Sequence, residues 1–153
     1  MNDFFQKYTD LGFIKKESIG FDQIEKQLIR AKKDLKVAEA NLDIDTEASY
    51  NYAYLAMLRA SRALMFSFGY RPTDGQQHKT AVFFTENVLG SEFAKLVKYF
   101  NIMRKKRNRF TYDEPEILVS EEETKNAINT AKEYVAKIMQ FIKEKNPQKE
   151  LFL

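Results

Sequence analysis

Residues 46–68 read TEASYNYAYLAMLRASRALMFSF. The stretch contains no glycine or proline, and after Glu47 its only charged residues are Arg59 and Arg62. Apolar and aromatic side chains therefore occupy nearly every face of the helix that this stretch predicts. Such a helix is buried by several neighbours or by a partner chain, and alanines at positions 53, 56, 60 and 63 allow those neighbours to approach closely. The segment predicts the central helix of an all-α fold.

Other segments with helical periodicity surround this central helix. Before it, apolar residues recur every three or four positions from Phe21 to Leu42. After it, the sequence predicts helices at 76–89 and 91–114. A last helix begins at Ser120, where Glu123 completes a capping box. All glycines and prolines fall between these segments, and no segment alternates apolar and polar residues long enough to predict a strand. The pattern favours an antiparallel up-and-down bundle of about five helices.

The length of 153 residues favours one domain. We expect a short N-terminal element at 1–20, formed by a helix and a turn, then the helical bundle at 21–146 and a C-terminal tail at 147–153. The sequence shows no signal peptide and no apolar run long enough to cross a bilayer, which predicts a cytoplasmic protein without a membrane partner.

Composition excludes several kinds of site. The chain has no cysteine, which excludes disulfides and thiol nucleophiles. It has one histidine, His78, which excludes a multi-histidine metal site within a single chain. We therefore expect no metal ion and no cofactor. The net charge of +3 is modest, so any site for an anion must be local.

A basic run, RKKRNRFTYD, covers residues 104–113 at the end of the predicted fourth helix. The apolar stripe that leads into this run consists of Phe93, Leu96, Val97, Phe100 and Met103. Its spacing of three and four continues to Arg107 and then to Phe110, so Arg107 is expected where a core or interface residue belongs. An arginine at such a position is unfavourable unless it is paired or its charged end reaches water.

Two interpretations of the basic run stay open. Basic side chains near a helix C-terminus complement the helix dipole and are commonly solvated, and Arg107 would then be paired or would extend to solvent. Alternatively, Arg107 belongs to a phosphate or RNA site, because the planar guanidinium binds phosphate oxygens through two hydrogen bonds. His78, at the start of the third predicted helix, is expected to be a surface residue or a locally hydrogen-bonded one. It would serve as an acid or base only if the fold brings it to Arg107.

The chain resembles the HEPN domain family in three stretches. These are 29–35 (IRAKKDL), 50–64 (YNYAYLAMLRASRAL) together with 69–72 (GYRP), and the basic run at 104–113. The resemblance covers about 20–145 and implies an all-α bundle that often dimerises around its motif helices. Many members are metal-independent endoribonucleases, often toxins or defence proteins, and some are encoded beside a small nucleotidyltransferase that acts as antitoxin.

The family motif is an arginine, usually followed by asparagine or another polar residue, with a histidine about five positions after the arginine. Arg107 and Asn108 match this motif, and Tyr112 stands at the histidine position. The resemblance thus implies an RNA-directed protein of toxin–antitoxin or defence type. Its catalytic residues would be Arg107, Asn108 and Tyr112, and Arg104, Lys105 and Arg109 would bind the nucleic acid. The expected partners are RNA, a second copy of the chain and a nucleotidyltransferase antitoxin.

Two other functions remain open, because tyrosine is a poor base near neutral pH. In one, the chain is a non-catalytic dimeric module that binds RNA, a nucleotide or a protein partner. In the other, it is a structural interaction domain in which Arg107 forms an ion pair at a dimer interface.

Overall fold

The computed structural model of the chain describes residues 2–73, 77–114 and 118–147. Gln76 and residues 148–153, assigned above to a helix start and to the C-terminal tail, lie outside these ranges. The described elements are, in order, α1 (Asn2–Asp10), β1 (Ile14–Lys16), α2 (Phe21–Asn41), α3 (Thr46–Ser67), β2 (Tyr70–Pro72), α4 (Gln77–Leu89), the 3₁₀ turn η1 (Ser91–Phe93), α5 (Ala94–Asn108), the π-helical turn η2 (Arg109–Asp113) and α6 (Glu121–Lys145).

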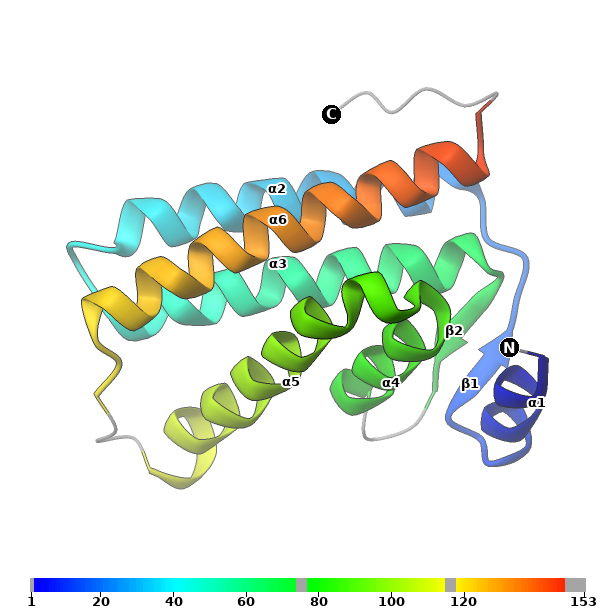
Figure 1. Cartoon of the computed structure of the whole chain (residues 1–153), viewed down its shortest axis with the longest axis horizontal. Coiled ribbons are helices and arrows are strands. Elements are labelled where there is room, and N and C mark those ends of the chain that lie inside the picture. The colour runs from blue at the N-terminus through cyan, green and yellow to red at the C-terminus, as the bar shows by residue number, and fades with distance from the viewer. Residues whose placement is uncertain (1, 74–76, 115–117, 148–153) are drawn as a thin grey trace.

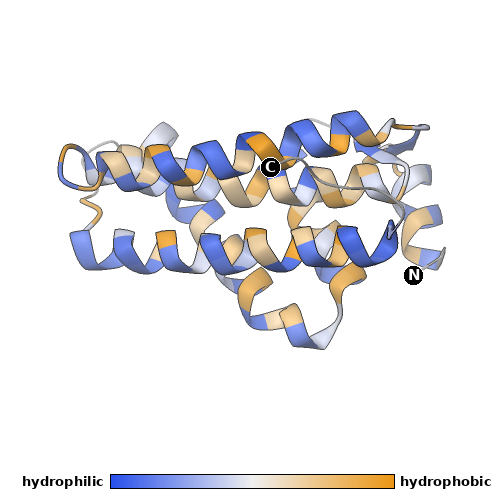
Figure 2. Cartoon of the chain, turned by 90° about the horizontal axis from the view of Figure 1, so that it is seen from above, coloured by the Kyte–Doolittle hydropathy of each residue, from blue (hydrophilic) through white to orange (hydrophobic). Residues whose placement is uncertain are grey.

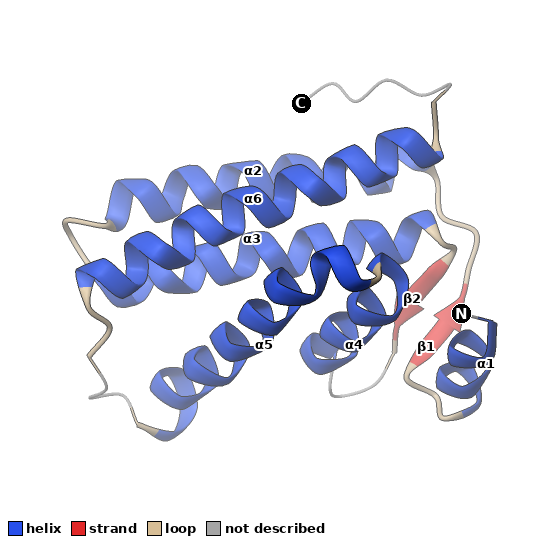
Figure 3. Ribbon diagram, in the orientation of Figure 1, coloured by secondary structure: helices blue, strands red, loops and turns tan. Residues whose placement is uncertain are grey.

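Helix α3 is the centre of the bundle. It packs against α2, α4, α5 and α6, and α2, α3 and α6 run side by side (Figure 1). Helices α4 and α5 pack against each other as well as against α3. Strands β1 and β2 form a short two-stranded ribbon, which lies beside α1 (Figure 3). The prediction of an all-α fold around residues 46–68 is confirmed.

The core forms where the apolar faces of the helices meet. Ala53, Ala56, Ala60 and Ala63 of α3 are fully buried, as are Ala31 and Ala38 of α2. Their small side chains let the two helices pack closely along their length. Bands of hydrophilic and hydrophobic residues alternate along the helices in Figure 2, as expected for helices with one buried side. Among the described helices, none is long and apolar enough to cross a membrane.

Side chains cap two of the helices at their N-termini. The carboxylate of Asp45 accepts a hydrogen bond from the Ala48 amide at 3.1 Å, and the hydroxyl of Ser120 accepts one from the Glu123 amide at 3.0 Å. Ser91 was expected to begin the helix predicted at 91–114. Instead it lies in the turn η1, which follows Gly90 with its positive φ of 73°, and α5 begins at Ala94.

The two serines give a matched test of the capping bond. Ser120→Ala is expected to lower the free energy of unfolding by about 1 kcal/mol, because it removes a side-chain acceptor from the first turn of α6. Ser91→Ala removes the same hydroxyl at a position without a capping bond and should change stability little. Urea unfolding of both variants measures the difference. Equal effects would contradict the capping role of Ser120.

Two short strands were missed in the sequence. Strand β1 pairs antiparallel with β2, with Ile14 opposite Pro72 and Lys16 opposite Tyr70. Each strand has three residues, too short for an alternating pattern to stand out. Helix α1 covers this region with aromatic rings, and the Phe5 ring stacks on Phe84 of α4 with centroids 5.5 Å apart. The ribbon therefore joins the N-terminal segment to the chain that enters α4.

Asp34 is also placed differently from the sequence pattern, which put it on a polar face of α2. Its side chain is fully buried, and the Nε atoms of Arg59 and Arg30 lie 2.6 and 3.2 Å from its carboxylate oxygens. A buried carboxylate requires such pairing because desolvation of an isolated charge is unfavourable. Helix-wheel position alone did not reveal that Arg59 of α3 reaches this carboxylate.

Candidate functional site

Helix α5 brings Arg107 to the edge of the core. Leu96, Val97, Phe100 and Met103 are buried on one stripe of this helix, Phe110 continues the stripe beyond it, and Arg107 lies between them half-buried. The helical spacing thus predicted the burial pattern around Arg107 correctly. The guanidinium is neither fully withdrawn from water nor free in it, and its neighbours determine its orientation.

Neutral groups surround the guanidinium of Arg107. Its Nε donates a hydrogen bond to the side-chain oxygen of Asn51 at 3.0 Å, and one terminal nitrogen donates weakly to Asn108 at 3.4 Å. The guanidinium carbon lies 5.8 Å from the ring centroid of Tyr54 and 5.5 Å from that of Tyr112. Among the described residues, no carboxylate forms an ion pair with Arg107. The arrangement orients the positive charge without neutralising it, which suits binding of an anion.

A π-helical turn brings Tyr112 to Arg107. On a regular α-helix, residues five positions apart point about 140° away from each other. Here α5 ends at Asn108, and η2 widens the turn at residues 109–113, closed by a hydrogen bond from the Glu114 amide to the Arg109 carbonyl. The Tyr112 ring consequently lies against the Arg107 guanidinium although 71% of the residue is exposed.

The three residues of the basic run that were expected to bind nucleic acid divide into two groups. Arg104 is half-buried, its Nε donates to the Asn101 side chain at 3.0 Å, and its charge acts on the same tyrosine as Arg107 does. Lys105 is exposed, and Arg109 is exposed with its guanidinium 3.4 Å from Glu114. The structure thus brings Arg107, Asn108 and Tyr112 together, and Arg104 acts on the same Tyr54 as Arg107. It leaves Lys105 and Arg109 on the outer surface.

The sequence did not locate the other side of this site. His78 of α4 lies against α3, where its Nδ1 is 2.7 Å from the hydroxyl of Tyr54. The two ring centroids are 5.7 Å apart, and the Arg107 guanidinium lies 5.8 Å from the centroid of the same Tyr54 ring. Tyr54 thus connects the histidine to the arginine. The signal available beforehand was the presence of polar and charged residues, Asn51 and Arg62, in an otherwise apolar helix.

Burial and positive charge control protonation at this site. Burial raises the pKa of Tyr54, an effect that Arg107 and Arg104 oppose, so the phenol stays neutral near pH 7. Burial and then the charges of Arg107, Arg62 and Arg104 lower the pKa of His78 to about 4. The imidazole is therefore neutral near pH 7 and available as a hydrogen-bonding group.

Arg62 of α3 adds a third unpaired positive charge. Burial, followed by the nearby charges of Arg71 and Arg59, lowers the pKa of Arg62, although an arginine remains protonated at neutral pH. Its buried Nε has no hydrogen-bond partner among the described residues. By contrast, Arg59 is paired with Asp34 and Arg71 with Glu17. Positive charge thus accumulates around His78 without a compensating carboxylate in the described part of the chain.

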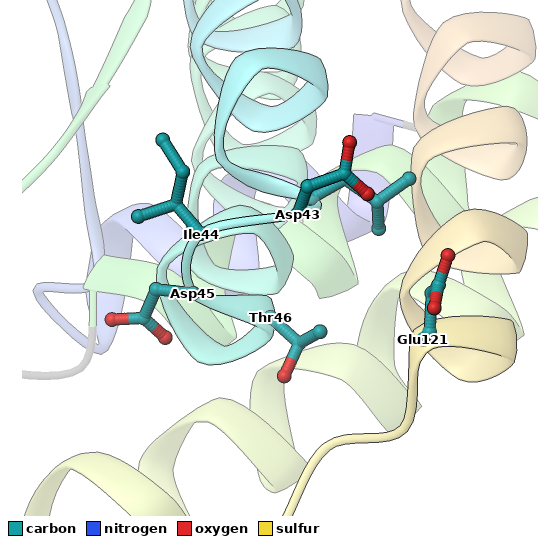
Figure 4. A pocket seen from close by; sticks show the side chains of 6 residues that line it. Asp43, Ile44, Asp45, Thr46 and Glu121 are labelled. Atoms are coloured by element: carbon teal, nitrogen blue, oxygen red, sulfur yellow. The ribbon is translucent and has the colours of Figure 1, made fainter.

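A separate hollow lies at the turn between α2 and α3. This cavity of about 620 Å³ is lined by Leu42, Asp43, Ile44, Asp45, Thr46 and Glu121. In Figure 4 the Asp45 carboxylate points away from Glu121, in keeping with its capping bond to α3. Within residues 2–73, 77–114 and 118–147, no group of three acidic or histidine side chains is arranged to hold a metal ion. The acidic hollow is therefore a surface turn. The better candidate site is formed by Arg62, Arg104 and Arg107, which we call the arginine cluster.

Comparison with known proteins adds one finding. A family model described as HEPN domain matches residues 24–145, which covers most of the chain and all of the arginine cluster. A search of curated proteins found no match.

Proposed function

Because this chain belongs to the HEPN domain family, we propose that it acts on RNA and that Arg107 binds a backbone phosphate. The observation that supports this proposal most strongly is the environment of Arg107. Its guanidinium is held by Asn51 and by two aromatic rings, and no carboxylate of the described chain neutralises it. Arg104 and Arg62 add positive charge to the same region. A phosphate is the common anion in RNA, and a guanidinium matches its geometry.

The proposed reaction is metal-independent cleavage of the RNA backbone. The 2′-oxygen of a ribose attacks the adjacent phosphorus and loses its proton, the bond from phosphorus to the 5′-oxygen breaks, and that oxygen gains a proton. The products are a 2′,3′-cyclic phosphate and a 5′-hydroxyl. Arg107 stabilises the negative charge that develops on the phosphoryl oxygens. Asn108 orients the guanidinium, and the Tyr112 phenol hydrogen bonds to the phosphate or positions it.

A second candidate function is binding without cleavage. Tyr112 is largely exposed and replaces an imidazole by a phenol, whose ordinary pKa of about 10 makes it a weak base near pH 7. The same arginine cluster would then bind RNA or a nucleotide through its charge. Of the three binding residues expected from the sequence, Arg104 has the most favourable position, whereas Lys105 and Arg109 would contact only a longer RNA that extends over the surface.

Incubation of the purified protein with mixed RNA in the presence of a chelator separates the two functions. We expect cleavage, with cyclic phosphate ends identified by mass spectrometry of the products. Binding that weakens steeply with added salt, without any product, would select the non-catalytic function. A protein that neither cleaves RNA nor binds it at low salt would exclude both.

We further propose the assembly that the family resemblance implies, a homodimer that meets around α5 and a nucleotidyltransferase partner acting as antitoxin. The exposed apolar side chains of Ile102 on α5 and of Leu118 beyond η2 support an interface in this region, since both lie near the basic run. Sedimentation velocity of the free protein measures the first association. Co-purification with the product of a neighbouring nucleotidyltransferase gene measures the second.

A further inference from the structure

We propose that His78 is an additional member of the phosphate-binding site around Arg107, where it binds the same phosphoryl group and takes up a proton when that group binds. The inference rests on the proposed function for the identity of the ligand, but the site it describes also accepts a simple oxyanion. It assigns a role to the single histidine of the chain, which lies outside the sequence motif. It also supplies an imidazole to a site whose motif position carries Tyr112.

The first argument is the geometry around Tyr54. This side chain is fully buried, its hydroxyl is 2.7 Å from His78 Nδ1, and its ring faces the Arg107 guanidinium at 5.8 Å. In the tautomer that carries its hydrogen on Nδ1, the imidazole donates to the Tyr54 hydroxyl oxygen, and the lone pair of Nε2 remains to take up a proton. His78 is half-buried, which gives a small anion access to its exposed part.

The second argument is the charge around the imidazole. Helix α3 contributes Tyr54 and Arg62, and α5 contributes Arg104 and Arg107. All three arginines act on His78, and among the described residues no carboxylate appears with them. These positive charges disfavour a proton on His78 only while they are not balanced by an anion.

The other elements near α4 do not change this balance. Arg71 of β2 acts on Arg62 and is itself paired with Glu17. Glu92 of η1 is exposed, and on α4 itself the Lys79 ammonium lies over the Phe83 ring at 5.5 Å. Among the described elements, α3 and α5 therefore contribute the charges that act on His78.

Binding of an anion is therefore coupled to protonation. In the free protein, burial and then the charges of the three arginines hold the pKa of His78 at about 4, so the imidazole is neutral near pH 7. An anion among the three arginines offsets their repulsion and adds a favourable negative neighbour, and both effects raise the pKa of the imidazole. At a pH between the free and the bound value, a proton from solvent joins Nε2 or is retained there as the ligand binds. The protonated imidazole then donates a charge-assisted hydrogen bond to a phosphoryl oxygen.

The single histidine makes the test direct. In the full chain, NMR of the labelled imidazole reports only His78, so its pKa is measured without assignment of other histidines. Two probes are used, inorganic sulfate, which stays a dianion across the titration, and a short 2′-O-methyl RNA without terminal phosphates, which cannot be cleaved. We expect each probe to raise the His78 pKa by about one unit or more in the wild type. We expect the shift to be lost in Arg107→Ala.

Variants separate the proton from the hydrogen bond. His78→Gln keeps a polar side chain that cannot titrate, so sulfate affinity should lose the increase that the wild type shows as the pH falls from the bound-state pKa towards the free value of about 4. Tyr54→Phe keeps the ring and removes the hydroxyl, and should weaken sulfate binding by up to about tenfold by freeing the imidazole. Lys79→Ala, one position from His78 and also the loss of a basic residue, is the matched control and should retain the wild-type pH dependence.

The outcomes distinguish this inference from the proposed function. RNA binding with an unchanged His78 pKa would overturn the inference and leave the RNA function standing. A pKa raised by sulfate but no RNA binding at low salt would support the anion site and reject RNA as its ligand. If neither probe binds or shifts the resonances, both proposals fail.

Discussion

Arg107→Ala is expected to lower metal-free RNA cleavage by about a hundredfold or more, because it removes the positive charge that stabilises the developing phosphoryl charge. The effect should appear in the cleavage rate with RNA at saturating concentration, where weakened binding alone has no influence. The fold should survive, since Arg107 is half-buried and its partner Asn51 can be hydrated once the guanidinium is gone. Gel-based single-turnover assays measure the rate, and circular dichroism checks the helices.

Two further variants define what Arg107 contributes. Arg107→Lys keeps the charge but lacks the planar guanidinium, so it should restore only part of the activity. Lys98→Ala removes a positive charge from an exposed position on the same helix and should leave the rate near that of wild type. If Arg107→Ala cleaved RNA as fast as wild type, the catalytic site would have to lie elsewhere. If Lys98→Ala were equally impaired, the loss of activity would not be specific to the position of Arg107.

Asp34→Ala is expected to have the largest effect on stability, lowering the free energy of unfolding by about 3 kcal/mol. The carboxylate is fully buried, and its removal leaves Arg59 of α3 without its partner at 2.6 Å. Arg59 keeps 30% of its side chain exposed, so the expected value lies at the lower end for a broken buried pair. Urea denaturation measures the change, with an unaltered m-value indicating that the unfolding transition is comparable.

Glu39→Ala is the matched control on the same helix. Glu39 pairs with Lys132 of α6, but about half of each side chain is exposed, and such pairs contribute at most about 1 kcal/mol. Both substitutions replace an acidic residue of α2 by alanine, which is the better helix former in each case, so helix propensity cannot explain a loss of stability. A loss of stability no greater for Asp34→Ala than for Glu39→Ala would show that burial of the Asp34 pair has no special role.

Much of the fold could be predicted because local rules agreed with one another. The continuous apolar character of residues 46–68 identified α3 as the central helix, and Asp45 and Ser120 mark two helix starts by their capping bonds. The strands and the buried position of Asp34 were not predictable in this way. Both depend on partners far along the chain, Pro72 for Ile14 and Arg59 for Asp34, and a helical pattern contains no information on such pairing.

The candidate site was predictable on one side only. The stripe on α5 indicated Arg107, because a charged residue interrupted a regular series of buried ones. The π-helical turn that brings Tyr112 to it was not visible, since a single turn of five residues is too short to alter the helical periodicity of the sequence. His78 was recognised as a titratable residue, but its contact with Tyr54 joins two helices across 24 positions of sequence and is a property of the packing.

The ribbon has a consequence for how the domain should be delimited. The match to the HEPN family begins at residue 24, yet β1 supplies the only strand that pairs with β2 in the described chain, and β2 leads into the helix that carries His78. A fragment cut at the family boundary would also uncover the rings of Phe68, Tyr70 and Phe84, which Phe5 now covers. An exposed aromatic patch of this kind promotes aggregation. The folded unit therefore extends upstream of the region that defines the family, and the N-terminal segment supports the chain that leads into α4.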